Sequence, residues 1–162
     1  MIKGASIMRA LGGGTVGAIA LTALHELTRR TVAHPPRMDV IGMRALSKTI
    51  RALGRRPARG DRLFRQTLLG DLAANTLYYS LAGSGPRAPH RGLLLGAAAG
   101  LGAAALPPVL GLGRSPGSRW PSTPLMTIAL YTAGGLAAAA AGRALGSGDA
   151  AAGGDQRRTR TG

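Results

Sequence analysis

Residues 92–113 read GLLLGAAAGLGAAALPPVLGLG, a run of 22 residues without a charged side chain between Arg91 and Arg114. A hydrocarbon core about 30 Å thick is crossed by roughly 20 apolar residues in an α-helix, since each residue advances the helix by about 1.5 Å. A second uncharged run of 23 residues, 120–142, lies between Arg119 and Arg143. These two runs predict membrane-spanning helices and set the class of the protein.

Two further segments are interrupted by polar groups but still reach a spanning length. Residues 66–86 carry a single charge, Asp71, with Tyr78 and Tyr79 toward one end, where aromatic side chains suit a membrane interface. The N-terminal segment spans if it forms one helix and Arg9 bends toward the lipid headgroups. Because three spans follow it, we prefer an uncleaved first helix to the alternative, a secretory signal peptide cut after the A-x-A site at 18–20.

These segments together predict an all-α fold, an integral membrane four-helix bundle. We place the spans at about 4–27, 64–84, 92–112 and 121–143, within a single membrane domain at 1–145. Residues 146–162 contain Gly, Ala and charged residues with little to bury, so we expect a disordered tail there.

The overall composition narrows the function classes. The 162 residues carry a net charge of +15, which in a soluble protein would suggest phosphate binding on a nucleic acid. Here the cations are segregated from long neutral runs, and one Phe, one Trp and three Tyr offer little surface for stacking bases. The composition therefore argues against nucleic-acid binding, and the absence of Cys excludes thiolate sites and disulfides.

The segment 25–65 carries eleven of the twenty-one basic residues. After a break at His34-Pro35-Pro36, we expect Asp39 to cap a basic amphipathic interfacial helix at about 39–54, ended by Gly54. Two sets of side chains fall on separate faces of that helix, an apolar set (Met43, Leu46, Ile50, Leu53) and a basic set (Arg44, Lys48, Arg51, Arg55). The pattern is typical of a helix lying on an anionic bilayer, with the basic set as candidate lipid- or anion-binding residues. An ordinary solvated helix covering its neighbours is the alternative.

The distribution of cations between short loops predicts the orientation. With the long basic segment in the cytoplasm, that side holds thirteen Lys and Arg residues and the other side holds eight. We therefore expect a multi-pass protein of the bacterial inner membrane with both termini outside the cytoplasm.

Asp71 is the most informative polar residue, because an ionised carboxylate near the middle of a span costs about 2.5–3.5 kcal/mol on insertion scales. Asn75 and Tyr78 follow it by four and seven residues and would extend one polar stripe, with Arg65 or another cation of the basic segment as counterion. The stripe is either an intramembrane site for a proton, a cation or a polar headgroup, or a clamp that only fixes helix packing.

His25 and Glu26 are the other polar candidates, at the end of the first span. The sequence His25-Glu26-Leu27-Thr28-Arg29 lacks the second imidazole of the HExxH zinc motif, so we predict no metal site. We expect Glu26 to pair with Arg29 or Arg30 on one helix face and to hold the end of the span to the basic segment. The alternative is a proton-relay or metal role for Glu26, with His25 and His34 as the nearest further groups.

Glycine repeats and prolines indicate how the helices pack. Small residues four apart, as at 92, 96 and 100, at 13 and 17, and at 142 and 146, let another backbone approach closely. We favour packing within the chain over a homo-oligomer face. Pro107 and Pro108 should end or kink the third span.

The stretches Leu24-His25-Glu26, Pro35-Pro36-Arg37-Met38-Asp39 and Gly70-Asp71-Leu72, with Asn75 and Tyr78-Tyr79, resemble small bacterial multipass membrane proteins that carry no assigned activity. The resemblance covers most of the chain. It implies that these segments form the working part of the molecule, and it implies no catalytic residue.

We therefore expect a non-enzymatic membrane protein whose basic cytoplasmic face binds anionic phospholipid or an acidic partner. The alternative is a small transporter or membrane enzyme with a polar site around Asp71. No catalytic residue, metal or cofactor is predicted.

Overall fold

The computed structural model describes the backbone of residues 2–158 and the side chains of residues 4–147. Within that part the chain forms five helices and no strand, which confirms the all-α class: α1 (Ile2–Thr31), α2 (Met38–Ala52), α3 (Gly60–Ser80), α4 (Ala88–Val109) and α5 (Ser122–Arg158). Three of them, α1, α4 and α5, contain segments long and apolar enough to cross a membrane. The chain thus has the features of a multipass membrane protein, and the fourth predicted span, now α3, stays a prediction.

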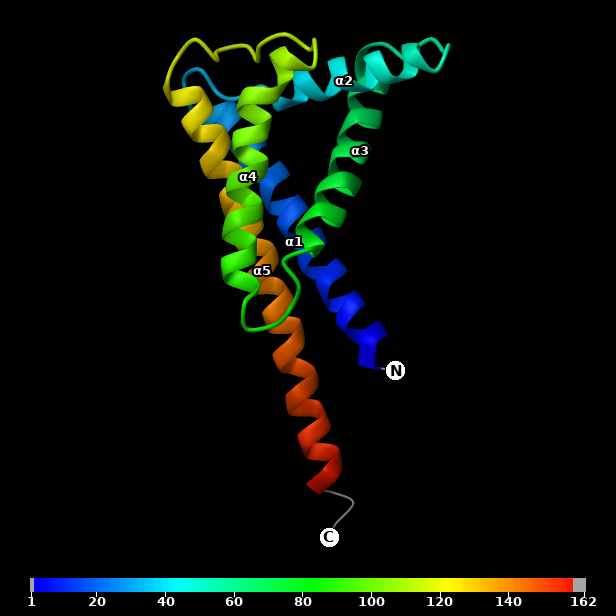
Figure 1. Cartoon of the computed structure of the whole chain (residues 1–162), viewed down its shortest axis with the longest axis vertical. Helices are drawn as coiled ribbons and strands as arrows, with labels where there is room; N and C mark the ends of the chain where they lie inside the picture. The colour runs from blue at the N-terminus through cyan, green and yellow to red at the C-terminus, as the bar shows by residue number, and fades with distance from the viewer. Residues whose placement is uncertain (1, 159–162) are drawn as a thin grey trace.

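α5 is the central helix, with α1 and α4 packed along it and α3 packed on α1 (Figure 1). Gly13 of α1 lies against Ala138 and Gly142, whereas Gly17 lies against Gly134 and Ala138. The residue numbers rise along α1 while they fall along α5, so the two helices are antiparallel. α4 is also antiparallel to α5, and α1 and α4 therefore end on the same side of the molecule.

The glycine repeats are used inside the chain. A Cβ atom built on Gly96 would lie 2.6 Å from Thr132 Cα, and one built on Gly100 would lie 2.6 Å from Ile128 Cα. Gly142 meets the turn between α3 and α4, where its Cβ would lie 2.7 Å from Gly83 O. The preference for packing within the chain is confirmed at these faces, and a homo-oligomer stays a prediction.

α3 touches α1 at one end and diverges from it toward the other. Gly14 lies against the backbone of Thr76 and Ser80, near the C-terminal end of α3. Toward its N-terminal end α3 leans away from α1, and α2 crosses the space between them (Figure 1). The contact of α2 with α3 includes Gly42, whose Cβ would lie 2.7 Å from Thr67 Cγ2. α1, α2 and α3 thus enclose a triangular region.

The predicted cap of α2 is wrong, although its predicted end is confirmed. The N-cap is Arg37, and Asp39 lies inside the first turn, where its carboxylate still faces the positive end of the helix dipole. Gly54 adopts φ +72° after the C-cap, its N–H donates to Arg51 O, and Arg55 N–H donates to Ile50 O. These two bonds form a Schellman ending, in which glycine is favoured because of its positive φ.

The C-terminal ends of α4 and α5 can be compared with the ends predicted from the sequence. Pro107 and Pro108 lie in the last turn of α4, which stops at Val109, so they mark the helix end. The tail predicted as disordered at 146–162 is helical as far as Arg158, because its alanines favour helix, and residues 159–162 lie outside the described residues.

Candidate functional site

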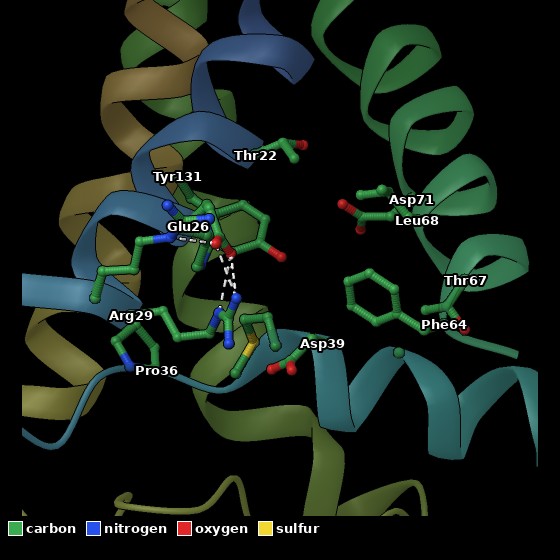
Figure 2. Close-up of a pocket in the computed structure, with 14 residues that line it drawn as sticks. Thr22, Glu26, Arg29, Pro36, Asp39, Phe64, Thr67, Leu68, Asp71 and Tyr131 are labelled. Carbon is green, nitrogen blue, oxygen red and sulfur yellow. Dashed lines mark hydrogen bonds and ion pairs between the residues drawn. The ribbon is translucent and has the colours of Figure 1, made fainter. Parts of the chain in front are cut away.

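A cavity of about 390 Å³ occupies the region enclosed by α1, α2 and α3, with one side chain from α5 (Figure 2). Its volume falls within the range of small-molecule pockets, about 300–1,000 Å³. The lining comprises polar residues (Thr22, His25, Glu26, Arg29, Arg30, Asp39, Thr67, Asp71, Tyr131) and less polar ones (Pro36, Met38, Gly42, Phe64, Leu68). Three of the five predicted intramembrane candidates, His25, Glu26 and Asp71, therefore meet at one cavity.

The α1 wall carries a three-residue ion-pair cluster. Arg29 donates from Nε to Glu26 Oε2 at 2.9 Å and from Nη2 to Glu26 Oε1 at 2.8 Å, and Arg30 donates from Nε to Glu26 Oε1 at 2.6 Å. The predicted pairing of Glu26 is thus confirmed with both arginines at once. The two bonds of Arg29 form a fork on the carboxylate, a geometry that orders the side chains. The cluster carries one net positive charge.

His25 and Thr22 lie on the same wall, one helical turn apart. His25 Nδ1 lies 3.1 Å from Leu21 O, so the tautomer that satisfies this contact donates from Nδ1 and leaves Nε2 as an acceptor. The His25 ring meets Tyr131 of α5 edge to face, with the centroids 5.6 Å apart. Nε2 of His25 and Oγ1 of Thr22 are buried without a hydrogen-bond partner among the described residues. The wall therefore holds unused hydrogen-bonding capacity.

The α3 wall presents Asp71, which faces the cavity opposite Glu26 and Arg29 (Figure 2). Asn75 Nδ2 donates to the backbone oxygen of Asp71 at 3.0 Å. Tyr78 does not extend this stripe, because its hydroxyl donates to Leu95 O of α4 at 3.0 Å. Of the predicted stripe, only Asp71 lines the cavity, and the site role of Asn75 and Tyr78 stays a prediction.

α2 closes the cavity at the end of the molecule that carries the basic segment 25–65 with Arg114 and Arg119, which we call the basic end. Arg37 donates from Nε to Asp39 Oδ1 at 2.9 Å and from Nη2 to Asp39 Oδ2 at 2.7 Å. Partial burial opposes ionisation of Asp39, but the hydrogen bonds and charge of Arg37 outweigh it and lower the pKa of this carboxyl below its usual value. Asp39 is thus a paired carboxylate at the edge of the cavity.

Asp71 differs from the other two carboxylic acids of the cavity, Glu26 and Asp39, in its ion pairs. Glu26 is bound by two arginines and Asp39 by one, whereas Asp71 has no ion pair in the part of the chain that the structure describes. Arg65, the counterion considered from sequence, does not line the cavity. The carboxyl group of Asp71 on α3 therefore faces the positively charged cluster on α1.

The basic set on α2 divides into two pairs. Arg44 Nη1 donates to Leu112 O at 3.1 Å and to Arg114 O at 3.0 Å, and Lys48 Nζ donates to Leu110 O at 2.7 Å. These two cations hold α2 to the loop that follows α4. The side chains of Arg51 and Arg55 are exposed and form no hydrogen bond or ion pair with another described residue. Only the second pair is fully available to an outside ligand.

A second set of contacts fixes the turn between α1 and α2 against the start of α5. Thr123 Oγ1 lies 2.8 Å from His34 O and 2.9 Å from Gly117 O, and can donate its proton to either. The His34 ring stacks on Trp120 with centroids 4.5 Å apart. These contacts hold the basic end of α1 beside the N-terminus of α5, and with it the cavity wall.

Comparison with protein-family models, with curated proteins and with solved structures gives no match. The function must therefore be inferred from the residues themselves. The cavity joins a cationic cluster, a carboxyl group without an ion pair, and apolar side chains. This combination suits a ligand that carries both charge and hydrocarbon.

Sequence reasoning missed Tyr131, Thr22 and the placement of Asp39 at the cavity. Tyr131 and Thr22 lie in apolar runs, where a single hydroxyl gives no signal of which neighbour it faces. Asp39 was placed at a helix cap, and its proximity to α1 depends on the turn at 32–37, which local patterns do not specify.

Proposed function

We propose that the protein is a four-span protein of a bacterial inner membrane whose basic cytoplasmic end binds anionic phospholipid. One observation carries the proposal: α1 and α4 end on the same side, which gathers the basic segment 25–65 together with Arg114 and Arg119 of the α4–α5 loop. Cations concentrated at one end of a set of apolar helices favour the cytoplasmic side and attract anionic lipid.

The direction of the helices supports α3 as the fourth span. Since α1 and α4 both run antiparallel to α5, the chain between them must return across the full thickness of the bundle (Figure 1). α3 has 21 residues, enough for about 30 Å. Its low hydropathy arises from Arg65, Asp71 and neighbouring polar residues near or facing the cavity rather than from a lack of spanning length.

α2 would lie at the headgroup level of this membrane. Arg44 and Lys48 anchor it to the loop after α4, leaving Arg51 and Arg55 to meet lipid phosphate. Leu53, at 72% exposure, lies beyond the protein core at the end of the apolar set and would enter the acyl boundary.

The test uses Trp120, the single tryptophan of the chain, which lies at the basic end. We expect stronger energy transfer from Trp120 to acyl-labelled phosphatidylglycerol than to acyl-labelled phosphatidylcholine in nanodiscs, with a loss of the difference in high salt. Replacing Arg51 and Arg55 together by Gln should weaken the preference about thirtyfold, because each cation contributes about 1 kcal/mol near an anionic surface.

The matched control removes the same charge from the opposite end, through Arg87→Gln with Arg143→Gln, and should leave the preference unchanged. Binding by the basic end would be refuted if the preference for phosphatidylglycerol did not change with salt concentration. It would also be refuted if the preference fell equally in both double variants.

A second candidate function is a small transporter or membrane enzyme that uses the cavity. The meeting of Asp71, Glu26 and His25 at one cavity favours it. Under this candidate Asp71→Asn abolishes the activity in reconstituted vesicles while the chain stays folded and inserted. A variant that loses only stability would favour a packing role for Asp71.

A further inference from the structure

The cavity has an unbalanced positive charge on one wall and a carboxyl group without a basic partner on the facing wall. On α1, two guanidinium groups share the single carboxylate of Glu26. On α3, Asp71 has no basic partner in the described part of the chain. Figure 2 shows Asp71 facing the cavity from one wall, with Glu26 and Arg29 on the opposite wall. A ligand that completes this arrangement carries an anion and a cation a short distance apart.

The cationic wall retains free donors. The bonds to Glu26 use Nε and Nη2 of Arg29 and Nε of Arg30. The Nη1 group of Arg29 and both Nη groups of Arg30 make no hydrogen bond with another described residue, and the Arg30 side chain is 73% exposed. Two adjacent guanidinium groups with unused N–H donors are well suited to a phosphate.

The opposite wall suits a primary ammonium group. Asp71 offers carboxylate oxygens that face the cavity. A primary ammonium has three N–H donors for such acceptors, whereas a quaternary ammonium has none. The anion–cation pair that fits the walls is therefore a phosphate linked to a primary amine.

The remaining lining indicates that the ligand belongs to the bilayer. Pro36, Met38, Phe64 and Leu68 give the cavity apolar surface, and none of its lining residues comes from α4. Leu69 on α3 is 67% exposed outside the cavity, next to the lining residue Leu68. The cavity also lies at the basic end, at the expected level of lipid headgroups.

From these observations we propose that the cavity binds the headgroup of a phosphoethanolamine lipid, with the phosphate at Arg29 and Arg30 and the ammonium at Asp71. The proposal rests on the membrane location proposed above, but not on binding of anionic lipid by the basic end. Phosphatidylglycerol would leave Asp71 without a cationic partner, and phosphatidylcholine could not donate hydrogen bonds to it. The acyl chains would leave between α1 and α3.

The experiment uses the full chain in mild detergent with equal amounts of phosphatidylethanolamine, phosphatidylglycerol and phosphatidylcholine of the same acyl chains. Bound lipid is identified by native mass spectrometry. We expect one phosphatidylethanolamine retained about tenfold more tightly than phosphatidylcholine, in line with a hydrogen bond between charged groups. Asp71→Asn should remove that preference. Asp61→Asn, which removes the same charge from the first turn of α3 outside the cavity, should preserve it.

A second pair of variants tests the arginines proposed to bind the phosphate. It keeps the proposal testable even if Asp71→Asn fails to fold. Arg30→Gln should weaken retention of phosphatidylethanolamine, while Arg62→Gln, an exposed arginine outside the cavity, should not. Excess soluble glycerophosphoethanolamine should leave the lipid bound, because it lacks the acyl chains. Full displacement by this compound would overturn a lipid ligand.

Equal retention of phosphatidylethanolamine and phosphatidylcholine by the unmodified protein would overturn the proposal, as would unchanged selectivity in Asp71→Asn together with unchanged retention of phosphatidylethanolamine in Arg30→Gln. The same mass spectra distinguish the cavity site from the proposed binding of anionic lipid by the basic end. Phosphatidylethanolamine selectivity without enrichment of phosphatidylglycerol supports the cavity site and contradicts lipid binding by the basic end, and the reverse pattern contradicts only the cavity site.

Discussion

At the scale of single residues, the contact between α4 and α5 depends on the missing side chain of Gly96. A methyl group there would meet Thr132 Cα at 2.6 Å, and backbone cannot move aside cheaply. We expect Gly96→Ala to lower the free energy of unfolding by about 1–3 kcal/mol, the usual cost of overpacking. Reversible unfolding in SDS, followed by circular dichroism, measures the change.

Gly70→Ala is the matched control within another helix. No atom lies within 4 Å of a Cβ at Gly70, so alanine should be neutral or raise stability by up to about 1 kcal/mol through its higher helix propensity. Equal destabilisation by the two substitutions would show that helix packing at Gly96 is not the cause.

Residue patterns located the polar site only in part. Asp71, Glu26 and His25 stand out because charged or titratable groups are rare beside apolar runs, and all three line the cavity. Tyr78 was assigned to the same site because residues seven apart share a helix face. A face can meet two neighbours along its length, however, and Tyr78 lies far enough along α3 to bind α4 instead.

At the scale of elements, α2 acts as a brace on the C-terminal end of α4. Lys48 donates to Leu110 O, the C-cap of α4, where unpaired carbonyls and the helix dipole favour a cation. We expect Lys48→Met to cost about 1–2 kcal/mol of stability and to speed hydrogen exchange of the amides in the loop at 110–114.

Arg51→Met is the control on the same helix, since the Arg51 side chain is exposed and bonds to no other described side chain or carbonyl. It should leave the exchange of the loop unchanged. Faster exchange in both variants would indicate a general loosening of α2 rather than loss of one contact.

The ends of α2 show which features of an element are predictable. Its C-terminus followed from Gly54, because a positive φ and two local hydrogen bonds form there without help from the rest of the chain. The function of its basic face did not follow, because the carbonyls bound by Arg44 and Lys48 come from residues more than sixty positions away. The periodicity of a helical sequence predicts on which face of the helix a side chain lies, but it does not predict which residue that side chain binds.

At the scale of the whole molecule, the two long uncharged runs predict α4 and α5, and α1 is the third helix long and apolar enough to cross a membrane. Because α1 and α4 both run antiparallel to α5, α3 is the decisive element. If α3 crosses the membrane, α2 and the turn at 81–87 lie on opposite sides. If it does not, α1 and α4 could not keep the same direction beside α5 with both in the bilayer.

The absence of cysteine allows this to be measured with single-cysteine variants. Thr49 is exposed on α2, and a Cβ at Gly85 meets nothing within 4 Å, so Thr49→Cys and Gly85→Cys should leave the fold intact. In intact spheroplasts, a membrane-impermeant maleimide should label Gly85→Cys, and it should label Thr49→Cys only after the membrane is opened. Reversed labelling would show that the orientation is opposite to the predicted one, with α3 still crossing the membrane. Labelling of both variants from one side would show that α3 does not cross it.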